Sequence, residues 1–67
     1  MELSGRVKNI IFKNTENGFT VFVLKNDDGN IVCNGTFENL KKNEYVILEG
    51  EYIIHKKYGR QFKTISM

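Results

Sequence analysis

The sequence has little of the chemistry that disulfides, metal sites and membrane spans require. It contains one cysteine, Cys33, and one histidine, His55. A lone cysteine excludes an internal disulfide, and one Cys with one His is too few for a four-ligand zinc site. No apolar run approaches the roughly 20 residues that cross a bilayer, and residues 1–5 do not resemble a signal peptide. These absences predict a reduced, cytoplasmic location without membrane association.

The residues of a catalytic site are also missing. No glycine-rich loop ends in Gly-Lys-Ser or Gly-Lys-Thr, as a phosphate-binding loop would. Ser4 and Ser66 lie near the chain ends, without a histidine and a carboxylate to activate them. Glu49 and Glu51 are two residues apart and so lie on the same face of their predicted strand, which is typical of a solvated strand face. We therefore expect a non-catalytic chain with no cofactor, metal or small-molecule substrate of its own.

The composition is that of one small globular domain. Its 67 residues leave no room for a second domain, and the 40% of apolar residues and 27% of charged residues argue against disorder. The net charge is only +2. A charge this small neither requires nor excludes a nucleic-acid partner, so the placement of the charges has to decide.

The order of residues predicts an all-β chain. Helical periodicity is almost absent, and β-branched and aromatic residues cluster in short runs separated by Gly, Asn and Asp. This pattern predicts five strands, at residues 2–12, 19–25, 31–36, 45–54 and 60–65. The expected connections are a loop at 13–18, a tight hairpin at 26–30 and a turn at 55–59. Residues 37–43 are the one stretch compatible with a short helical turn.

Alternation along the strands predicts which side chains form the core. In the second strand these are Phe22 and Leu24, and in the last strand Phe62, flanked by Gln61 and Lys63. The fourth strand has an inner face and a wetter outer face. Its inner face carries Val46, Leu48, Tyr52 and Ile54 around Gly50. Its outer face carries Ile47, Glu49, Glu51 and Ile53.

Two glycines inside long strands indicate how the sheet closes. Gly5 and Gly50 interrupt the first and fourth strands, where a glycine marks a bend, a bulge or a close backbone approach. Five strands with such bends, and a helical turn between strands three and four, predict an OB-fold Greek-key barrel. An SH3-like barrel is the alternative, because propensity alone does not exclude it.

Basic and aromatic residues gather at the predicted turns, which favours weak contact with single-stranded DNA. In an OB barrel, the loops after the first and fourth strands flank the face where single strands bind. Cations there would neutralise phosphates and an exposed ring would stack on a base. The candidate contact residues are Lys13, Asn14, Asn17, Lys25, His55, Lys56, Lys57, Tyr58 and Arg60.

Two other interpretations of these residues remain open. The turn at 55–59 could be a solvated hairpin, with Tyr58 folded over the barrel end and His55 a turn residue. In addition, Phe19, Val21 and Val23 share one face of the second strand. If they point outward, they favour docking against another protein domain more than a sugar–phosphate backbone.

Two stretches of the sequence resemble a known family. Residues 3–7 running into 10–21, with Glu16-Asn17-Gly18 at their centre, resemble the opening of RecD-like (RecD/TraA family) ATP-dependent DNA helicases. These helicases are often described as exodeoxyribonuclease V alpha chain. Residues 48–52, followed by the run 55–62, resemble a second hallmark of the same N-terminal OB module. Lys56 departs from the pattern, because many relatives have proline there.

The resemblance implies an N-terminal accessory domain of a bacterial helicase that acts in DNA repair or recombination. The parent's motor would bind ATP and magnesium and move on single-stranded DNA, but no ATP-binding residue can be assigned to this chain. Its partners would be single-stranded DNA and the motor domains of the same polypeptide or a partner subunit. Three hypotheses remain: a DNA-contacting module, a protein-docking scaffold, and a free-standing nucleic-acid binder.

Overall fold

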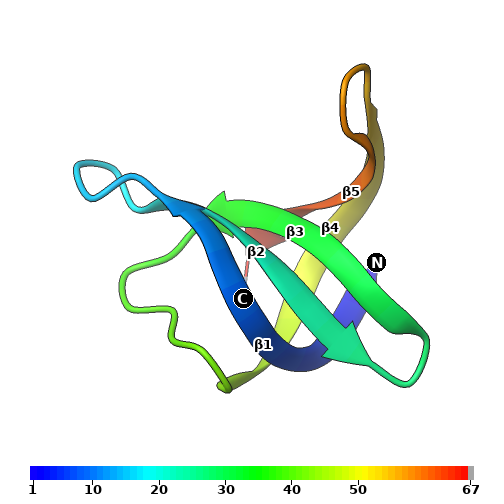
Figure 1. Cartoon of the computed structure of the whole chain (residues 1–67), viewed down its shortest axis with the longest axis horizontal. Coiled ribbons are helices and arrows are strands. Elements are labelled where there is room, and N and C mark those ends of the chain that lie inside the picture. Colours follow the sequence, from blue (N-terminus) through cyan, green and yellow to red (C-terminus); the bar gives the residue numbers. More distant parts are fainter. Residues whose placement is uncertain (67) are drawn as a thin grey trace.

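The chain forms one closed five-stranded barrel (Figure 1). The computed structural model describes residues 1–66. Its strands are β1 (Glu2–Lys13), β2 (Phe19–Asn26), β3 (Gly29–Thr36), β4 (Tyr45–His55) and β5 (Gly59–Ser66). Around the barrel their order is β1-β2-β3-β5-β4, and β4 pairs with β1 to close the sheet. The β3–β5 pair is parallel and the other pairs are antiparallel, which is the predicted OB arrangement.

β1 closes the barrel because it pairs with two neighbours. Its first half, from Glu2 to Arg6, pairs with β4, and its second half, from Arg6 to Lys13, pairs with β2. Gly5 lies where the strand passes from one neighbour to the other. A Cβ at this position would lie 2.5 Å from the carbonyl oxygen of Lys25. The predicted close approach at Gly5 is therefore confirmed.

Two bulges in β1 decide which of its side chains point outward. The register with β2 shifts between Val7 and Asn9 and again between Ile10 and Phe12. Each shift adds one unpaired residue, and the strand then twists more strongly. Val7 is buried and Ile10 packs against the core, while Phe12 is exposed. Strict alternation from Val7 would have placed Asn9 inside instead of Ile10.

The core fills the barrel with side chains from every strand and from the segment between β3 and β4. The predicted core residues Phe22, Leu24 and Phe62 are fully buried. Phe22 meets Phe37 edge-to-face at 5.4 Å between ring centroids, a favourable arrangement for two aromatic rings. The other buried apolar residues are Leu3, Val7, Cys33, Leu40, Val46 and Leu48, with Tyr52 partly buried against them.

Two predictions about side-chain direction are wrong at the β4–β5 hairpin. Ile54 was expected in the core but is 78% exposed. Beyond Tyr52 the two strands leave the barrel as a projecting hairpin (Figure 1), in which Ile54 pairs only with Arg60. Gln61, expected to flank Phe62 on the outside, is buried. Its Oε1 accepts a 2.9 Å hydrogen bond from Nδ2 of Asn34 across the β3–β5 pair, which compensates for its burial.

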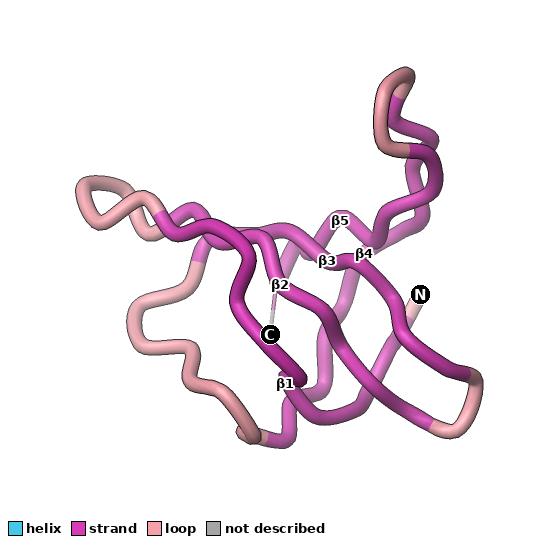
Figure 2. Tube along the Cα trace, viewed as in Figure 1, coloured by secondary structure: helices cyan, strands magenta, loops and turns pink. Residues whose placement is uncertain are grey.

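The predicted helical turn at residues 37–43 is also wrong. This segment contains bends and a turn but no helix, and Figure 2 shows it as a loop. Apart from one turn, in which Glu44 N donates to the Lys41 carbonyl, its backbone groups bond to neighbouring segments. Phe37 N donates to the Gly18 carbonyl, and Asn43 N donates to the Val7 carbonyl. With Phe37 and Leu40 both buried, the segment covers one end of the barrel in an extended course.

We predict that Gly50→Ala destabilises the barrel. A Cβ at Gly50 would overlap the carbonyl oxygen of Lys63, because β4 and β5 approach closely at the register shift beside Glu49. Overpacking of this kind costs about 1–3 kcal/mol or more, and each kcal/mol lowers Tm by about 4–8 °C in a domain of this size. Thermal unfolding followed by circular dichroism measures the shift.

The matched control for this prediction is Gly59→Asn. Gly59 has a φ of 80°, which asparagine tolerates better than other side chains, and a Cβ there meets no atom within 4 Å. This variant should melt close to the parent chain. Equal melting temperatures for Gly50→Ala and the parent would contradict the close approach of β4 and β5.

We also predict that Cys33 is inert in the folded chain. Its side chain is buried, and this burial raises the pKa of the thiol from 9.0 to about 12. The reactive species is the thiolate. At about pH 8, a disulfide reagent such as DTNB should therefore label the unfolded chain in denaturant and leave the native chain unlabelled. Prompt stoichiometric labelling of the native chain would show that Cys33 is accessible.

Candidate nucleic-acid interface

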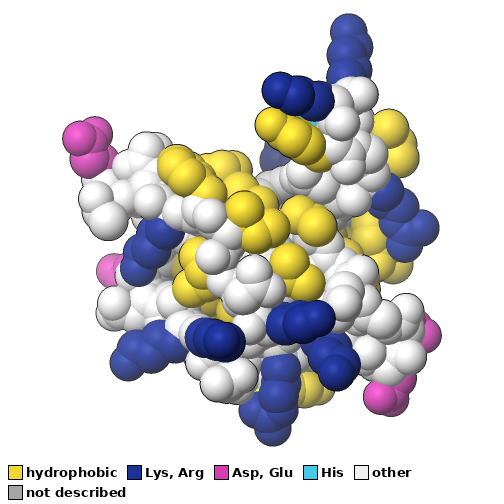
Figure 3. All heavy atoms as spheres, viewed as in Figure 1, with side chains coloured by type: hydrophobic (Ala, Val, Ile, Leu, Met, Phe, Trp, Pro, Cys, Tyr) yellow, Lys and Arg dark blue, Asp and Glu magenta, His cyan; other side chains and the backbone are white. Residues whose placement is uncertain are grey.

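The outer face of β2 and β3 carries a continuous set of apolar side chains. Along β2 the residues Phe19, Val21 and Val23 alternate with buried Thr20, Phe22 and Leu24, so these three side chains point outward. Register pairing places Phe12 beside Val21 and Val32 beside Val23. Figure 3 shows hydrophobic side chains gathered over this face. We call the set the apolar strip: Phe12, Phe19, Val21, Val23 and Val32.

The two rings of the apolar strip are its most accessible members. Phe12 is 52% exposed and Phe19 is 38% exposed, whereas the three valines are half-buried. Phe12 reaches this face because the second bulge in β1 lies between Ile10 and Phe12, which places Phe12 opposite Val21. Sequence alternation alone did not identify Phe12 as a site residue, and only the run Ile11-Phe12 before a loop could have indicated it.

The loop between β1 and β2 is shaped by the two asparagines predicted to contact DNA. Oδ1 of Asn14 accepts from Glu16 N, and Oδ1 of Asn17 accepts from Phe19 N, both at 2.9 Å. These are Asx turns, in which the side chain imitates a backbone turn. The oxygen of each side chain is therefore committed to the loop, and its NH₂ group is the part left for a ligand.

The charge beside this loop is mixed. Exposed Lys13 lines a hollow of about 410 Å³ together with the carboxylates of Glu16 and Glu38. Two carboxylates near one ammonium reduce the attraction for phosphate. Of the predicted residues on this side, Lys13 is therefore a weak phosphate contact.

The projecting hairpin is organised by His55. Its Nδ1 accepts hydrogen bonds from Lys57 N at 3.1 Å and from Tyr58 N at 3.2 Å. The imidazole lies 4.9 Å from the Tyr58 ring, and the Lys57 Nζ lies 5.5 Å from the centre of the same ring. His55 thus stabilises the turn, as the alternative interpretation held. Tyr58 is 67% exposed at the hairpin and is not folded over the barrel end.

At the base of the hairpin, Arg60 stacks on Tyr52. The Arg60 guanidinium carbon lies 3.9 Å from the centre of the Tyr52 ring, and Tyr52 packs edge-to-face on buried Phe62. The cation–π attraction favours this position of the guanidinium over the Tyr52 ring. Tyr52 was expected in the core. The alternation of side chains along the strand did not indicate its contact with Arg60.

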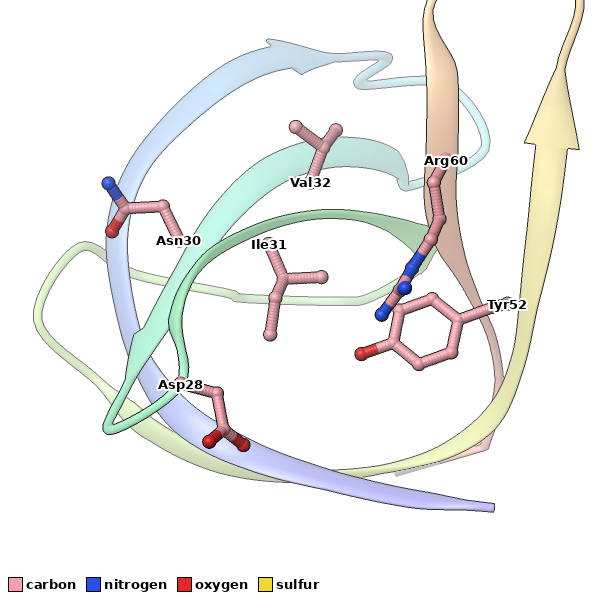
Figure 4. Close-up of a pocket in the computed structure, with 6 residues that line it drawn as sticks. All are labelled: Asp28, Asn30, Ile31, Val32, Tyr52 and Arg60. Atoms are coloured by element: carbon pink, nitrogen blue, oxygen red, sulfur yellow. The ribbon is translucent and has the colours of Figure 1, made fainter.

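A hollow of about 530 Å³ connects the hairpin to the apolar strip. Figure 4 shows Tyr52 and Arg60 side by side at one edge of this hollow, with Asp28 across from them. Val32 belongs both to the hollow and to the apolar strip. The structure therefore joins Arg60 to the strip through one surface. The lining residues are Asp28, Asn30, Ile31, Val32, Tyr52 and Arg60.

The structure separates Lys25 from the other candidate residues. The loop after β1 and the β4–β5 hairpin lie on two sides of the β2–β3 face (Figure 1). Lys25 lies at the far end of β2 from Phe19 and pairs with Arg6 of β1. It belongs to a different cluster of cations. Among residues 1–66 no group of His, Cys, Asp and Glu could hold a metal ion, and no helix is long and apolar enough to cross a membrane.

Comparison with known proteins agrees with this barrel. The sequence model of the family described as "ATP-dependent DNA helicase YrrC, OB-fold domain" matches residues 1–67. No curated protein and no solved structure matches the chain. The matched family is that of a helicase's OB-fold domain, which is an accessory module and not the motor. Because the match covers every residue, the chain belongs to the family of OB-fold domains of the ATP-dependent DNA helicase YrrC.

Proposed function

We propose that this chain is an accessory module of a RecD-like DNA helicase that binds single-stranded DNA weakly across the apolar strip. The observation that carries the proposal is the continuity of one surface from the exposed rings of Phe12 and Phe19 to the stacked Arg60. OB barrels use this face and its flanking loops for single strands. The parent helicase would act in DNA repair or recombination in the cytoplasm.

The chemistry of the surface suits unstacked bases and a few phosphates. Bases would stack on Phe12, Phe19 and Tyr58, with each stack contributing about 1–3 kcal/mol where it forms. The backbone would meet the cations at the margins of the strip. With Lys13, Lys56, Lys57 and Arg60 as the contacts, the slope of log K against log salt would be about −3. So few contacts correspond to weak binding, as expected for an accessory domain.

In this proposal, ATP and magnesium belong to the motor of the parent helicase. The chain supplies a surface that holds the strand near the motor, which raises the local concentration of DNA. The family match supports this role over that of a free-standing nucleic-acid binder. The other partner would be the motor itself or a partner subunit.

Docking against protein is the second candidate function, and the half-buried valines favour it. Val21, Val23 and Val32 form an apolar surface without a charged side chain among them. Such a surface suits a protein partner better than a phosphate backbone. The two functions can be separated because they depend on different members of the strip.

We predict that Phe19→Ala weakens binding of an oligo(dT) strand. Loss of one stacked base, worth about 1–3 kcal/mol, should lower the affinity by about 5-fold to 150-fold. Titration of ¹⁵N-labelled chain at two salt concentrations gives both the affinity and the residues affected. Shifts are expected at Phe12, Phe19 and the 56–60 hairpin.

The matched control is Ile47→Ala. Ile47 is 51% exposed on β4, which adjoins neither β2 nor β3. The Ile47→Ala variant should therefore bind oligo(dT) with the affinity of the parent chain. If no resonance of the parent chain moves at near-millimolar DNA, single-strand contact by this domain is wrong.

For docking, we expect Val21→Asp and Val23→Asp to fold normally and to lose association with the motor fragment of the parent helicase. The side chains point outward, so a carboxylate remains solvated in the free domain and becomes desolvated in a complex. Circular dichroism checks the fold and a pull-down with the motor fragment checks association. Retained association of both folded variants would exclude docking through the strip.

A further inference from the structure

Four cations surround a hollow that lies outside the proposed single-strand interface. Arg6 and Lys8 come from β1, Lys25 from β2 and Lys42 from the segment between β3 and β4. The hollow measures about 420 Å³, and Val7, Asn9 and Asn43 complete its lining. The chain has ten Lys and Arg residues in total, so this one place holds a large share of its positive charge. We call these four residues the basic cluster.

The fold brings the basic cluster together by long-range pairing. Arg6 lies opposite Lys25 in the β1–β2 ladder, and the first bulge leaves Lys8 and Asn9 both exposed. The turn that carries Lys42 is attached to β1 by two backbone hydrogen bonds. One runs from Asn43 N to the Val7 carbonyl at 2.7 Å, and the other from Val7 N to the Glu44 carbonyl at 2.9 Å.

The guanidinium of Arg6 is held in place before any ligand arrives. Its Nη1 donates to the carbonyl of Asn43 at 3.1 Å, and its Cζ lies 5.8 Å from the centre of the Tyr45 ring. A positioned guanidinium loses less rotamer entropy when it binds an anion. The remaining N–H donors of Arg6 are those available for a phosphate.

The cations of the basic cluster form no ion pair among residues 1–66. Within residues 1–66, the ion pair formed at 4 Å or less joins the Met1 amino group to Glu49 and involves none of the four cations. Two carboxylates lie near the cluster. Oε1 of Glu44 accepts from the Lys41 backbone N–H, and Asp27 lines a neighbouring hollow with Arg6 and Lys25. Like charges placed opposite each other on a sheet, such as Arg6 and Lys25, destabilise it.

We propose that the basic cluster binds the phosphate backbone of duplex DNA next to the single strand. The lining of the hollow holds no exposed apolar side chain, since Val7 is fully buried. The exposed ring beside it, Tyr45, lies against the Arg6 guanidinium. Duplex DNA carries about one charge per 1.7 Å, which favours a compact group of cations. Figure 3 shows Lys and Arg side chains gathered below the apolar strip, apart from those of the hairpin.

The position of the basic cluster suits a junction between duplex and single strand. Phe19 and Lys25 lie at opposite ends of β2 and are separated by about 20 Å at 3.3 Å per residue. That distance corresponds to about six phosphates along one strand of a duplex. The cluster does not require the apolar strip, so this proposal can fail or hold independently of single-strand binding.

The test is a titration of the ¹⁵N-labelled chain with a short blunt duplex, and with oligo(dT) at equal phosphate concentration. Duplex should shift the resonances of the basic cluster and of Asn43, and oligo(dT) should shift them less. With four phosphate contacts, the duplex affinity should fall about 100-fold between about 50 mM and 200 mM salt. Equal shifts of the cluster by both ligands would overturn the preference for duplex, and no shift would overturn the site.

The decisive variant is the double substitution Lys8→Gln with Lys42→Gln. Both side chains are exposed, and their removal relieves like-charge repulsion, so Tm should stay the same or rise. The slope of log K for duplex binding against log salt concentration should halve, from about −3.6 to about −1.8. The matched control, Lys56→Gln with Lys57→Gln, removes the same charge from the hairpin and should change the duplex affinity by less than about twofold. Equal losses in both double variants would mean nonspecific attraction to net charge and would refute the site.

Discussion

Closure of the barrel depends on two places where backbones come into direct contact, at Gly5 and at Gly50. At each glycine the neighbouring strand's carbonyl oxygen occupies the space that a side chain would need. Without these contacts β1 could not pair with both β2 and β4, and β4 could not turn toward β5. A chain of 67 residues buries little surface to compensate for such a loss. The closed sheet is therefore the condition for every surface described above.

Closure also determines what the outside of the barrel presents. A strongly curved strand such as β1 needs extra residues, and its two bulges supply them at Lys8 and Ile11. The first bulge exposes Lys8 and Asn9 together and so contributes to the basic cluster. The second turns Phe12 onto the apolar strip. The same curvature that closes the core thus distributes cations to one region and aromatic rings to another.

This distribution separates two kinds of chemistry on one small domain. The apolar strip offers rings and half-buried valines, which suit unstacked bases or a protein partner. The basic cluster offers four cations around one hollow, which suits a phosphate backbone. Between them the turns are held by local hydrogen bonds, from His55 in the hairpin and from Asn14 and Asn17 in the first loop. A net charge of +2 conceals this separation, because it sums ten Lys and Arg residues against eight Asp and Glu residues without regard to their positions.

The sequence by itself determined the strands to within two residues, the barrel glycines and most of the core, because alternation and turn residues are local signals. Tertiary structure alone decided the rest. Ile54 alternates with the outward residues of β4 as a core residue would, but it lies beyond the barrel. Residues 37–43 form backbone hydrogen bonds to Gly18 and Val7 instead of a helical turn. Phe12 and the basic cluster likewise depend on bulges and on pairing between distant strands. Such features depend on which strands pair and in which register. The residue types of one segment do not determine that pairing.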